Sequence, residues 1–372
     1  MAEDRYSSRI FIDGSGIAEE QMDRIEEITV SQMVDRAWEA RIKLRLILDE
    51  DGNWIGEEEQ DWQAFNSVRV ELRILGGDWT ALIEGPVVGY DNEKSSQPGQ
   101  SYLIIIVQDN SVLLNRDDEV FAFEDLTDSE IAGEIYGRFP DIVPEHEEES
   151  VDPPEGTLPP VLRRRGTAMN LLRFLATRNG KHAYILPGDA PGESKGYFHA
   201  FPQETDGLPG LVLNGSARNI DEFHVNRNAQ APANFTARTL DVSDRSSQDA
   251  ASTNEEFGRE GETQDGERPP ANRLISPLAG AYGSLQQAVA ALTEQSAWAY
   301  QASGSVHGLC YHGILSPYRL VPVHAGASRL SGNYLLTEVN HTFDRSHYSQ
   351  SFKMQRIGSS ELDSAGAVPG VF

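Results

Sequence analysis

Alternation of apolar and charged residues dominates the first third of the chain and predicts antiparallel β structure. Between residues 40 and 48 every second residue is apolar, and the residues between them include three basic ones: Arg41, Lys43 and Arg45. Residues 68–74 repeat this alternation. Successive side chains of a strand point to opposite faces, so each run predicts a strand with one buried and one solvated face. Two further strands are expected at residues 79–84 and 102–108.

Glycine and proline separate these strands and predict the turns between them. The turn signals are Gly76-Gly77, Gly85-Pro86 and Pro98-Gly99. Glycine tolerates the backbone angles of tight turns, and proline removes a hydrogen-bond donor from a strand. Asp51-Gly52 predicts a hairpin turn for the same reason. Short strands at this spacing are typical of a β-sandwich or a β-barrel.

Helical signals begin at Thr127 and predict a middle region of mixed helix and strand. Thr127 and Glu130 have the spacing of a capping box, and apolar residues follow them at helical intervals. A second helix is predicted from Thr167 to Asn179. Residues 140–162, between the two helices, are rich in proline and acidic residues and should be irregular. Two strands should follow the second helix, at residues 182–186 and 197–201.

Strand patterns return in the last part of the chain, where a polar segment and a helix interrupt them. Residues 243–272 nearly lack large apolar side chains, so they predict a mobile loop that cannot bury enough surface to offset the entropy of ordering. Ser284 and Gln287 open a third helix that we expect to run to about Ala302. The predicted strands are 219–225, 235–242, 334–343 and 348–357, and the last two should form a hairpin.

Composition limits the kinds of partner that the chain can bind. With 58 acidic and 31 basic residues, the formal charge is -27, so the average surface should repel phosphate backbones and anionic membranes. Nucleic acid is therefore not an expected partner. No apolar run approaches the roughly 20 residues of a membrane helix, and the start of the chain is acidic, so we expect synthesis in the cytoplasm without membrane insertion. A surface rich in acid suits high salt, but an ordinary acidic protein explains the composition equally well.

Candidate chemical motifs fail on spacing. The acidic run at Asp49 resembles a calcium loop, but its sixth position is Trp54 and its twelfth is Gln60, where such a loop needs glycine and glutamate. Cys310 and His312 lack the second cysteine and the paired spacing of a zinc site. No nucleophile elbow or complete dinucleotide fingerprint is present. We therefore expect no catalytic residue, no metal and no cofactor.

Three consecutive arginines form the strongest positive cluster in this acidic sequence. Arg163, Arg164 and Arg165 lie immediately before the second predicted helix. They are weak candidates for a contact with an acidic neighbouring subunit. A solvated loop is an equally good interpretation of the same three residues.

The order of these elements resembles the late control protein D hub proteins of contractile phages and the hub part of VgrG spike proteins of type VI secretion systems. Four stretches carry the resemblance: 101–116, 123–132, 167–176 with 219–223, and 330–341 with 348–352. Each stretch is degenerate, but their order and spacing together are specific. The resemblance covers roughly residues 25–357 and includes no catalytic motif.

The resemblance implies a β-rich α+β fold with two tube-like β-barrel domains, an α+β insert and a helical insertion in the second barrel. The implied division is residues 1–115 for the first barrel, 116–215 for the middle domain, 216–243 with 304–358 for the second barrel, 244–303 for an acidic mobile loop and helix, and 359–372 for a C-terminal tail. Open barrel edges favour assembly, because a neighbouring subunit can pair them.

The implied function is structural. Three chains would form a ring that adapts a sixfold inner tube to a threefold spike, within a virion tail or an injection machine. Its partners would be two sister copies, the inner tube protein ring, a separate spike protein and other baseplate proteins. Two alternatives remain open at this point: a tail-tip glycan or peptidoglycan hydrolase, and a carbohydrate-binding adhesion module. A hydrolase would need two carboxylates facing a cleft about 5–10 Å apart.

Overall fold

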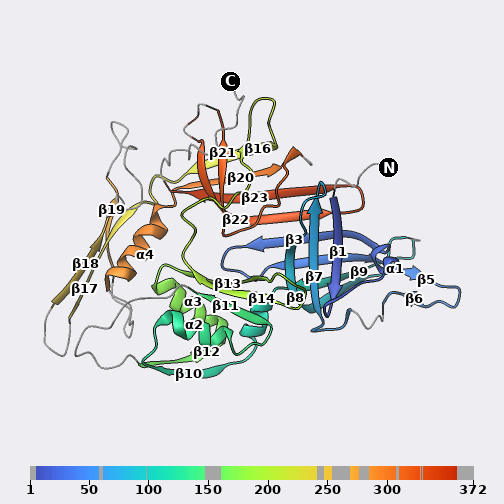
Figure 1. The fold of residues 1–372 in the computed structure, drawn as a ribbon, viewed down its shortest axis with the longest axis horizontal. Coiled ribbons are helices and arrows are strands. Elements are labelled where there is room, and N and C mark those ends of the chain that lie inside the picture. Colours follow the sequence, from blue (N-terminus) through green and yellow to red (C-terminus); the bar gives the residue numbers. More distant parts are fainter. Residues whose placement is uncertain are drawn as a thin grey trace.

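The computed structural model describes residues 6–57, 62–97, 99–146, 161–240, 247–253, 269–275, 285–306, 310–326, 328 and 330–357. The fold is β-rich with few helices, as the sequence predicts (Figure 1). None of the described helices is long and apolar enough to cross a membrane. The predicted tail at residues 359–372 and most of the predicted loop at 243–272 lie outside the described residues.

Strands dominate the first third of the structure, where alternating residues predict them. They are β1 (Tyr6–Ile12), β2 (Ser15–Gly16), β3 (Ile25–Met33), β4 (Glu39–Arg45), β5 (Ile47–Leu48), β6 (Trp54–Ile55), β7 (Ser67–Ile74), β8 (Thr80–Glu93) and β9 (Tyr102–Gln108), with the short helix α1 (Glu19–Met22) after β2. The Asp49 run forms the β5–β6 turn, in which the Asp49 carboxylate accepts bonds from the backbone amides of Asp51 and Asn53. The hairpin interpretation of this run is confirmed.

The middle region packs two helices against small sheets. Its elements are the 3-10 helix η2 (Asn110–Asn115), β10 (Glu119–Glu124), α2 (Asp128–Tyr136), β11 (Ile142–His146), β12 (Val161–Gly166), α3 (Ala168–Arg178), β13 (His182–Pro187) and β14 (Ser194–His199). The predicted capping box is present, because Thr127 and Glu130 each accept a backbone hydrogen bond from the other. Both predicted helices are confirmed.

The last part of the chain returns to strands around one helix. Its elements are β15 (Leu211–Val212), β16 (Ile220–Arg227), β17 (Ala233–Leu240), β18 (Ser247–Ser252), β19 (Ala271–Ile275), α4 (Leu285–Ala297), β20 (Tyr300–Val306), β21 (Leu320–His324), β22 (Gly332–Phe343) and β23 (Tyr348–Arg356). The β22–β23 hairpin lies where the sequence predicts it.

Thirteen strands join in one sheet, which differs from the expectation of two separate barrels. Its path runs β16-β20-β23-β22-β3-β4-β9-β8-β7-β1-β2, with β15 and β21 beside it. The path does not close on itself among the described residues. The two halves meet where β22 pairs with β3 over six rungs, from Glu338 opposite Met33 to Phe343 opposite Ile28. Each half therefore covers one strand edge of the other half, so the backbone groups of both edges find hydrogen-bond partners within the chain.

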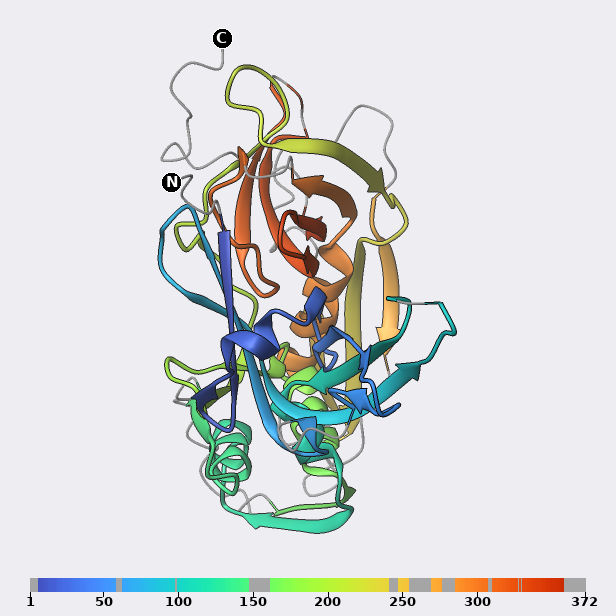
Figure 2. The same ribbon diagram turned by 90° about the vertical axis from the view of Figure 1, so that its right-hand side faces the viewer.

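Four buried clusters hold these elements. One lies against β3, β4 and β7–β9, a second surrounds α2 and α3, and a third lies against β20–β23. The fourth lies between α4 and the three-stranded sheet β18-β17-β19, and Val289 of α4 is fully buried there. Figures 1 and 2 show this α4 unit on the opposite side of the molecule from β1 and β7. The domain limits drawn from the sequence remain a prediction.

Several local predictions were wrong for identifiable reasons. Gly85-Pro86 is not a turn but lies inside β8, which changes partner there from β7 to β9. Gly85 is required because a Cβ would lie 2.0 Å from the Gln108 carbonyl oxygen. The third helix ends at Ala297, and β20 begins three residues later. The segments predicted to be irregular contain strands, because each pairs with an ordered neighbour: β11, β12, β18 and β19.

A buried ion network fixes the middle region to the first sheet. Arg69 of β7 bonds to Glu71 at 2.7 Å and to Glu84 of β8 at 2.6 Å, and these three residues are at most 4% exposed. The Arg69 guanidinium also donates to the Ala190 carbonyl, and the Gly192 amide donates to Glu84. Burial raises the pKa of Glu84, and these hydrogen bonds only partly offset the effect.

Replacing Arg69 should therefore destabilise the protein strongly. The Arg69→Ala variant leaves the buried Glu84 carboxylate without a cation and leaves Glu71 only its partner Arg9, which should lower the free energy of unfolding by about 3–5 kcal/mol. The matched control is Arg238→Ala, because the Arg238–Asp249 pair is fully exposed and screened by solvent, so its loss should change stability little. Urea unfolding of both variants measures the difference. Equal losses would contradict a special role for the network.

Candidate functional site

One solvated surface runs without interruption across both halves of the joined sheet. We call it the polar face and define it by one row of directly paired residues that crosses seven strands, from β16 to β9: Glu222, Ser305, Ser351, Asn340, Ser31, Glu39 and Gln108. None of these seven side chains is apolar, and most are short. Side chains alternate along strands, so the same seven strands turn their other side to the cores.

The neighbouring row shows the opposite character. It contains Gln350, His341, Val30, Ala40 and Val107, and all five are buried. Apolar packing therefore fixes which side of the sheet meets solvent, and a one-residue slip between β22 and β3 would exchange the two rows. The polar face is a consequence of this register.

Charges on the polar face are mostly neutralised locally. Arg41 pairs with Asp91 at 2.6 Å, and Lys353 pairs with Glu338 at 2.8 Å. Burial alone would raise the pKa of Glu338, but the hydrogen bonds from Lys353 and Asn340 outweigh it and lower that pKa. The surface is therefore polar and hydrated, without a strong field of one sign across it.

A buried polar network holds the seam between β3 and β22. His341 is fully buried, with Nδ1 3.0 Å from the Tyr348 hydroxyl and Nε2 3.3 Å from the Gln32 side-chain oxygen. Gln32 in turn donates to the Leu82 carbonyl at 2.7 Å. Burial lowers the pKa of His341 to about 3, so the imidazole is neutral at physiological pH. Each polar group of this chain of contacts has a partner, which makes the seam geometrically specific.

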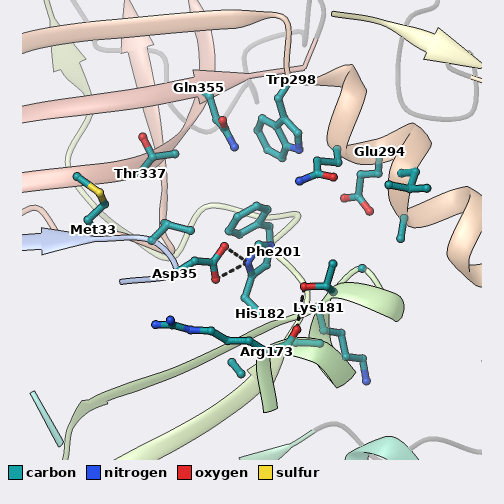
Figure 3. Close-up of a pocket in the computed structure, with 18 of the residues that line it drawn as sticks. Met33, Asp35, Arg173, Lys181, His182, Phe201, Glu294, Trp298, Thr337 and Gln355 are labelled. Atoms are coloured by element: carbon teal, nitrogen blue, oxygen red, sulfur yellow. Dashed lines mark hydrogen bonds and ion pairs between the residues drawn. The ribbon is translucent and has the colours of Figure 1, made fainter. Parts of the chain in front are cut away.

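One cleft lies where four parts of the chain meet. Its volume is about 490 Å³, and its walls come from the end of β3, from α3 and β13, from α4, and from β22 and β23 (Figure 3). The His182 ring stacks on Phe201 at 3.8 Å between centroids, and Phe201 meets Trp298 edge to face at 5.7 Å. His182 also pairs with Asp35 at 3.0 Å. These contacts tie the middle region to the first sheet and to the segment after α4.

The cleft contains three carboxylates, and two of them already contact a basic side chain of the protein. Asp35 pairs with His182, and Glu338 pairs with Lys353. Glu294 is the third, and burial raises its pKa, with a smaller opposing effect of the nearby His182. Figure 3 shows Glu294 projecting from α4 toward the aromatic residues. This arrangement provides one weak acid rather than a working pair of acids.

The three arginines singled out by the sequence lie on β12. Arg163, Arg164 and Arg165 are exposed, and β12 pairs with β10. Arg164 lies over the Phe174 ring at 3.8 Å and so covers the edge of the middle core. The segment is therefore a strand and not the solvated loop that was the second interpretation. None of the three lines the cleft.

No metal centre is formed within the described part of the chain, where no three His, Cys, Asp or Glu residues gather to hold an ion. Cys310, considered for zinc, is exposed and free. The polar face itself was missed from the sequence, although a signal existed. Small polar residues recur at every second position in three of its strands, as Ser303 and Ser305, Asn340 and Thr342, and Ser349 and Ser351.

Comparisons with known proteins identify the fold. No protein-family model matches the chain, and no curated protein sequence does. Among solved structures, the 43 kDa tail protein of prophage MuSo2 from Shewanella oneidensis is similar with a TM-score of 0.64 at 15% identity, covering 94% of this chain and 98% of its own. A tail protein from Neisseria meningitidis gives 0.62 at 12% identity, covering 95% and 97%. The chain has a phage tail protein fold.

The similarity of fold extends to a VgrG complex. A chain of the Francisella PdpA–VgrG complex is similar with a TM-score of 0.53 at 9% identity, and the match covers 97% of this chain and 60% of that one. The resemblance to phage tail hub and VgrG proteins inferred from the sequence is confirmed at the level of the fold.

The buried seam of this tail protein fold generates a pH prediction. An unfolded histidine has a pKa near 6.5 and the folded His341 near 3, so between these values the unfolded chain binds more protons and stability falls as pH falls. The free energy of unfolding should fall by about 1.4 kcal/mol for each unit that the pH falls in that interval. His341→Gln removes it, so the stability advantage of the natural protein over the variant should shrink by roughly 2 kcal/mol between pH 7 and pH 5.

Urea unfolding at the two pH values measures this difference. Asp109, whose pKa burial raises to about 6, titrates in both proteins and cancels when they are compared. A difference between the two proteins that is constant with pH, or that grows as pH falls, would show that His341 is not held neutral at the seam.

Proposed function

We propose that the protein is the structural hub of a contractile phage tail or contractile injection system. Three copies form a ring around the axis, and the polar face of each copy lines the central channel. The observation that carries this proposal is the polar face itself, which crosses from one half of the chain to the other without a break.

The physical reasoning concerns the two faces of the sheet. One face is buried against cores within the chain, so the other must be solvated or covered by a partner. Its short side chains and locally paired charges offer few of the large anchors that protein interfaces use. A water-filled channel is a suitable environment for such a surface. The two halves of the joined sheet in each of three chains would give six units around the axis, which matches a sixfold tube.

Two kinds of contact would complete the ring. In the described residues, β16 is the last strand at one end of the path, and at the other end β2 pairs with β1 only at Phe11 and Ile12, so the outer edge of β16 and the first part of β1 could pair with a sister copy. Exposed arginines on β12 supply a second contact, and we retain Arg163, Arg164 and Arg165 as proposed subunit-interface residues. The proposed partners are the sister copies, the inner tube ring, a separate spike protein and other baseplate proteins. Its place is an assembled virion tail or injection particle.

A structural role is favoured over a glycan hydrolase. A glycan hydrolase needs two carboxylates in a cleft, one as an acid and one as a base or nucleophile. In the cleft of Figure 3, Asp35 is hydrogen-bonded to His182 and Glu338 is paired with Lys353, and the similar solved structures are tail proteins. Incubating the purified protein with cell walls in a zymogram tests this directly, and a clear lysis zone would contradict the structural role.

Cysteine labelling tests whether the polar face lines a channel. In a Cys310→Ser background, a cysteine introduced by Ser351→Cys lies on the polar face, and one introduced by Glu134→Cys lies on the outside of α2. In the assembled ring, a small maleimide should label both sites. A bulky polyethylene-glycol maleimide should label only the Glu134→Cys protein, because a channel excludes it.

The unassembled chain provides the control, since both reagents should label both variants there. Measuring mass in solution, alone and with the neighbouring tail proteins, establishes which samples contain three copies. Equal labelling of the two sites by the bulky reagent in a confirmed trimer would place the polar face on the outside and contradict the proposed channel.

A further inference from the structure

The cleft of Figure 3 contains one carboxylate that no other described residue uses. Glu294 of α4 is half-buried, and among the described residues it has no hydrogen bond and no ion pair. Burial raises its pKa, and His182 is the one charged neighbour in the described structure that affects this pKa. An unpaired carboxylate that is partly removed from water is costly, so a cation from outside the chain would stabilise it.

The surroundings of Glu294 suit a flat cation. Figure 3 shows its side chain projecting from α4 toward the aromatic residues, where Phe201 and Trp298 meet edge to face at 5.7 Å. Both rings are half-buried and line the cleft together with Gln295 and Gln355, whose amide oxygens can accept hydrogen bonds. A guanidinium is planar, donates five hydrogen bonds and stacks on aromatic rings, so it can use all three kinds of group at once.

The basic residues of the cleft walls do not take this place. Arg173 and Lys181 line the cleft, but neither affects the pKa of Glu294. Lys181 donates to the Ser129 hydroxyl at 3.3 Å and points away from the aromatic residues in Figure 3, and Arg173 acts on the buried Asp109. Three carboxylates line the cleft against these two permanent cations, which leaves a negative excess while the histidine is neutral.

The walls of the cleft are held in place without a ligand. Asp35 has a φ of 58°, and this left-handed backbone is fixed by its amide, which donates to the Tyr318 hydroxyl at 2.7 Å, and by its carboxylate, which lies 3.0 Å from Nδ1 of His182. On the opposite wall, a Cβ on Gly180 would lie 3.1 Å from the Cβ of Ala291, so α4 packs closely on the loop after α3. The volume of about 490 Å³ is typical of preformed ligand sites, which lose little entropy on binding.

We propose that this cleft binds an arginine side chain of a partner protein, with the guanidinium between the Glu294 carboxylate and the rings of Phe201 and Trp298. The formal charge of -27 attracts a basic partner to the chain as a whole, and Glu294 gives that attraction a specific end point. The view that the partner is another tail component rests on the proposed hub function. The preference for arginine does not.

A matched pair of peptides tests the arginine preference in the full chain. The probes are the tripeptide acetyl-Gly-Arg-Gly-amide and its citrulline counterpart, which has nearly the same shape but no charge. The arginine peptide should bind at least about tenfold more tightly and should shift the indole signal of Trp298 in nuclear magnetic resonance spectra. Glu294→Gln should remove the difference between the peptides. The control Glu124→Gln changes an exposed carboxylate on β10 and should leave it intact.

Several results would overturn the arginine site. They are equal binding of the two peptides, unchanged arginine binding by the Glu294→Gln protein, a lysine peptide that binds as tightly as the arginine peptide, and no binding of the arginine peptide at millimolar concentration. Trp298→Phe identifies the indole signal, and a shift confined to other tryptophans would place the binding elsewhere. All of these results leave the hub function standing, because none of them concerns the ring.

Assembly with the neighbouring tail proteins tests the source of the arginine. In a confirmed ring, Glu294→Gln should weaken the association of one other component about tenfold, and Glu124→Gln should weaken none. Unchanged association of every component would show that no tail protein supplies the arginine. The lack of any ring with the natural protein would instead contradict the hub function.

Discussion

The pairing of β3 with β22 is the constraint on which the rest of the structure depends. These strands lie about 300 residues apart in the sequence, yet their hydrogen bonds join the two halves into one sheet. The register is fixed because one row, including Val30 and His341, must be buried. The same register places Ser31 beside Asn340 on the solvated side, where their side chains bond at 2.6 Å. One pairing therefore determines both the buried seam and the continuous polar face.

The other parts of the chain are attached to this sheet by polar and aromatic contacts that are specific in geometry. Arg69 connects β7 and β8 to the loop before β14, and His182 connects the middle region to Asp35 at the end of β3. Phe201 and Trp298 extend the contact to the α4 unit. Buried ion pairs such as those of Arg69 add little net stability, because the cost of removing the charges from water offsets their attraction. Removing one partner is nevertheless costly, because it leaves the other charge buried and unpaired. These contacts set where each unit lies relative to the polar face.

The sequence predicted elements well where local chemistry decides them. The Thr127 capping box, the Asp49 turn and the β22–β23 hairpin all follow from neighbouring residues. Long-range pairing was not predictable in the same way. Ser247–Ser252 has no apolar run of its own and becomes β18 because β17 pairs with it under α4. Gly85-Pro86 resembles a turn, but the strand continues because it changes partner there. The joining of the two halves depends on the same kind of distant pairing.

Electron cryomicroscopy of the protein assembled with its neighbouring tail components is the most direct measurement of the central claim. We expect three copies around one axis, with Ser31, Asn340 and Ser351 facing a central channel and the β3–β22 seam intact in each copy. A map in which the polar face points outward, or in which single copies occupy the particle without a ring, would contradict the account.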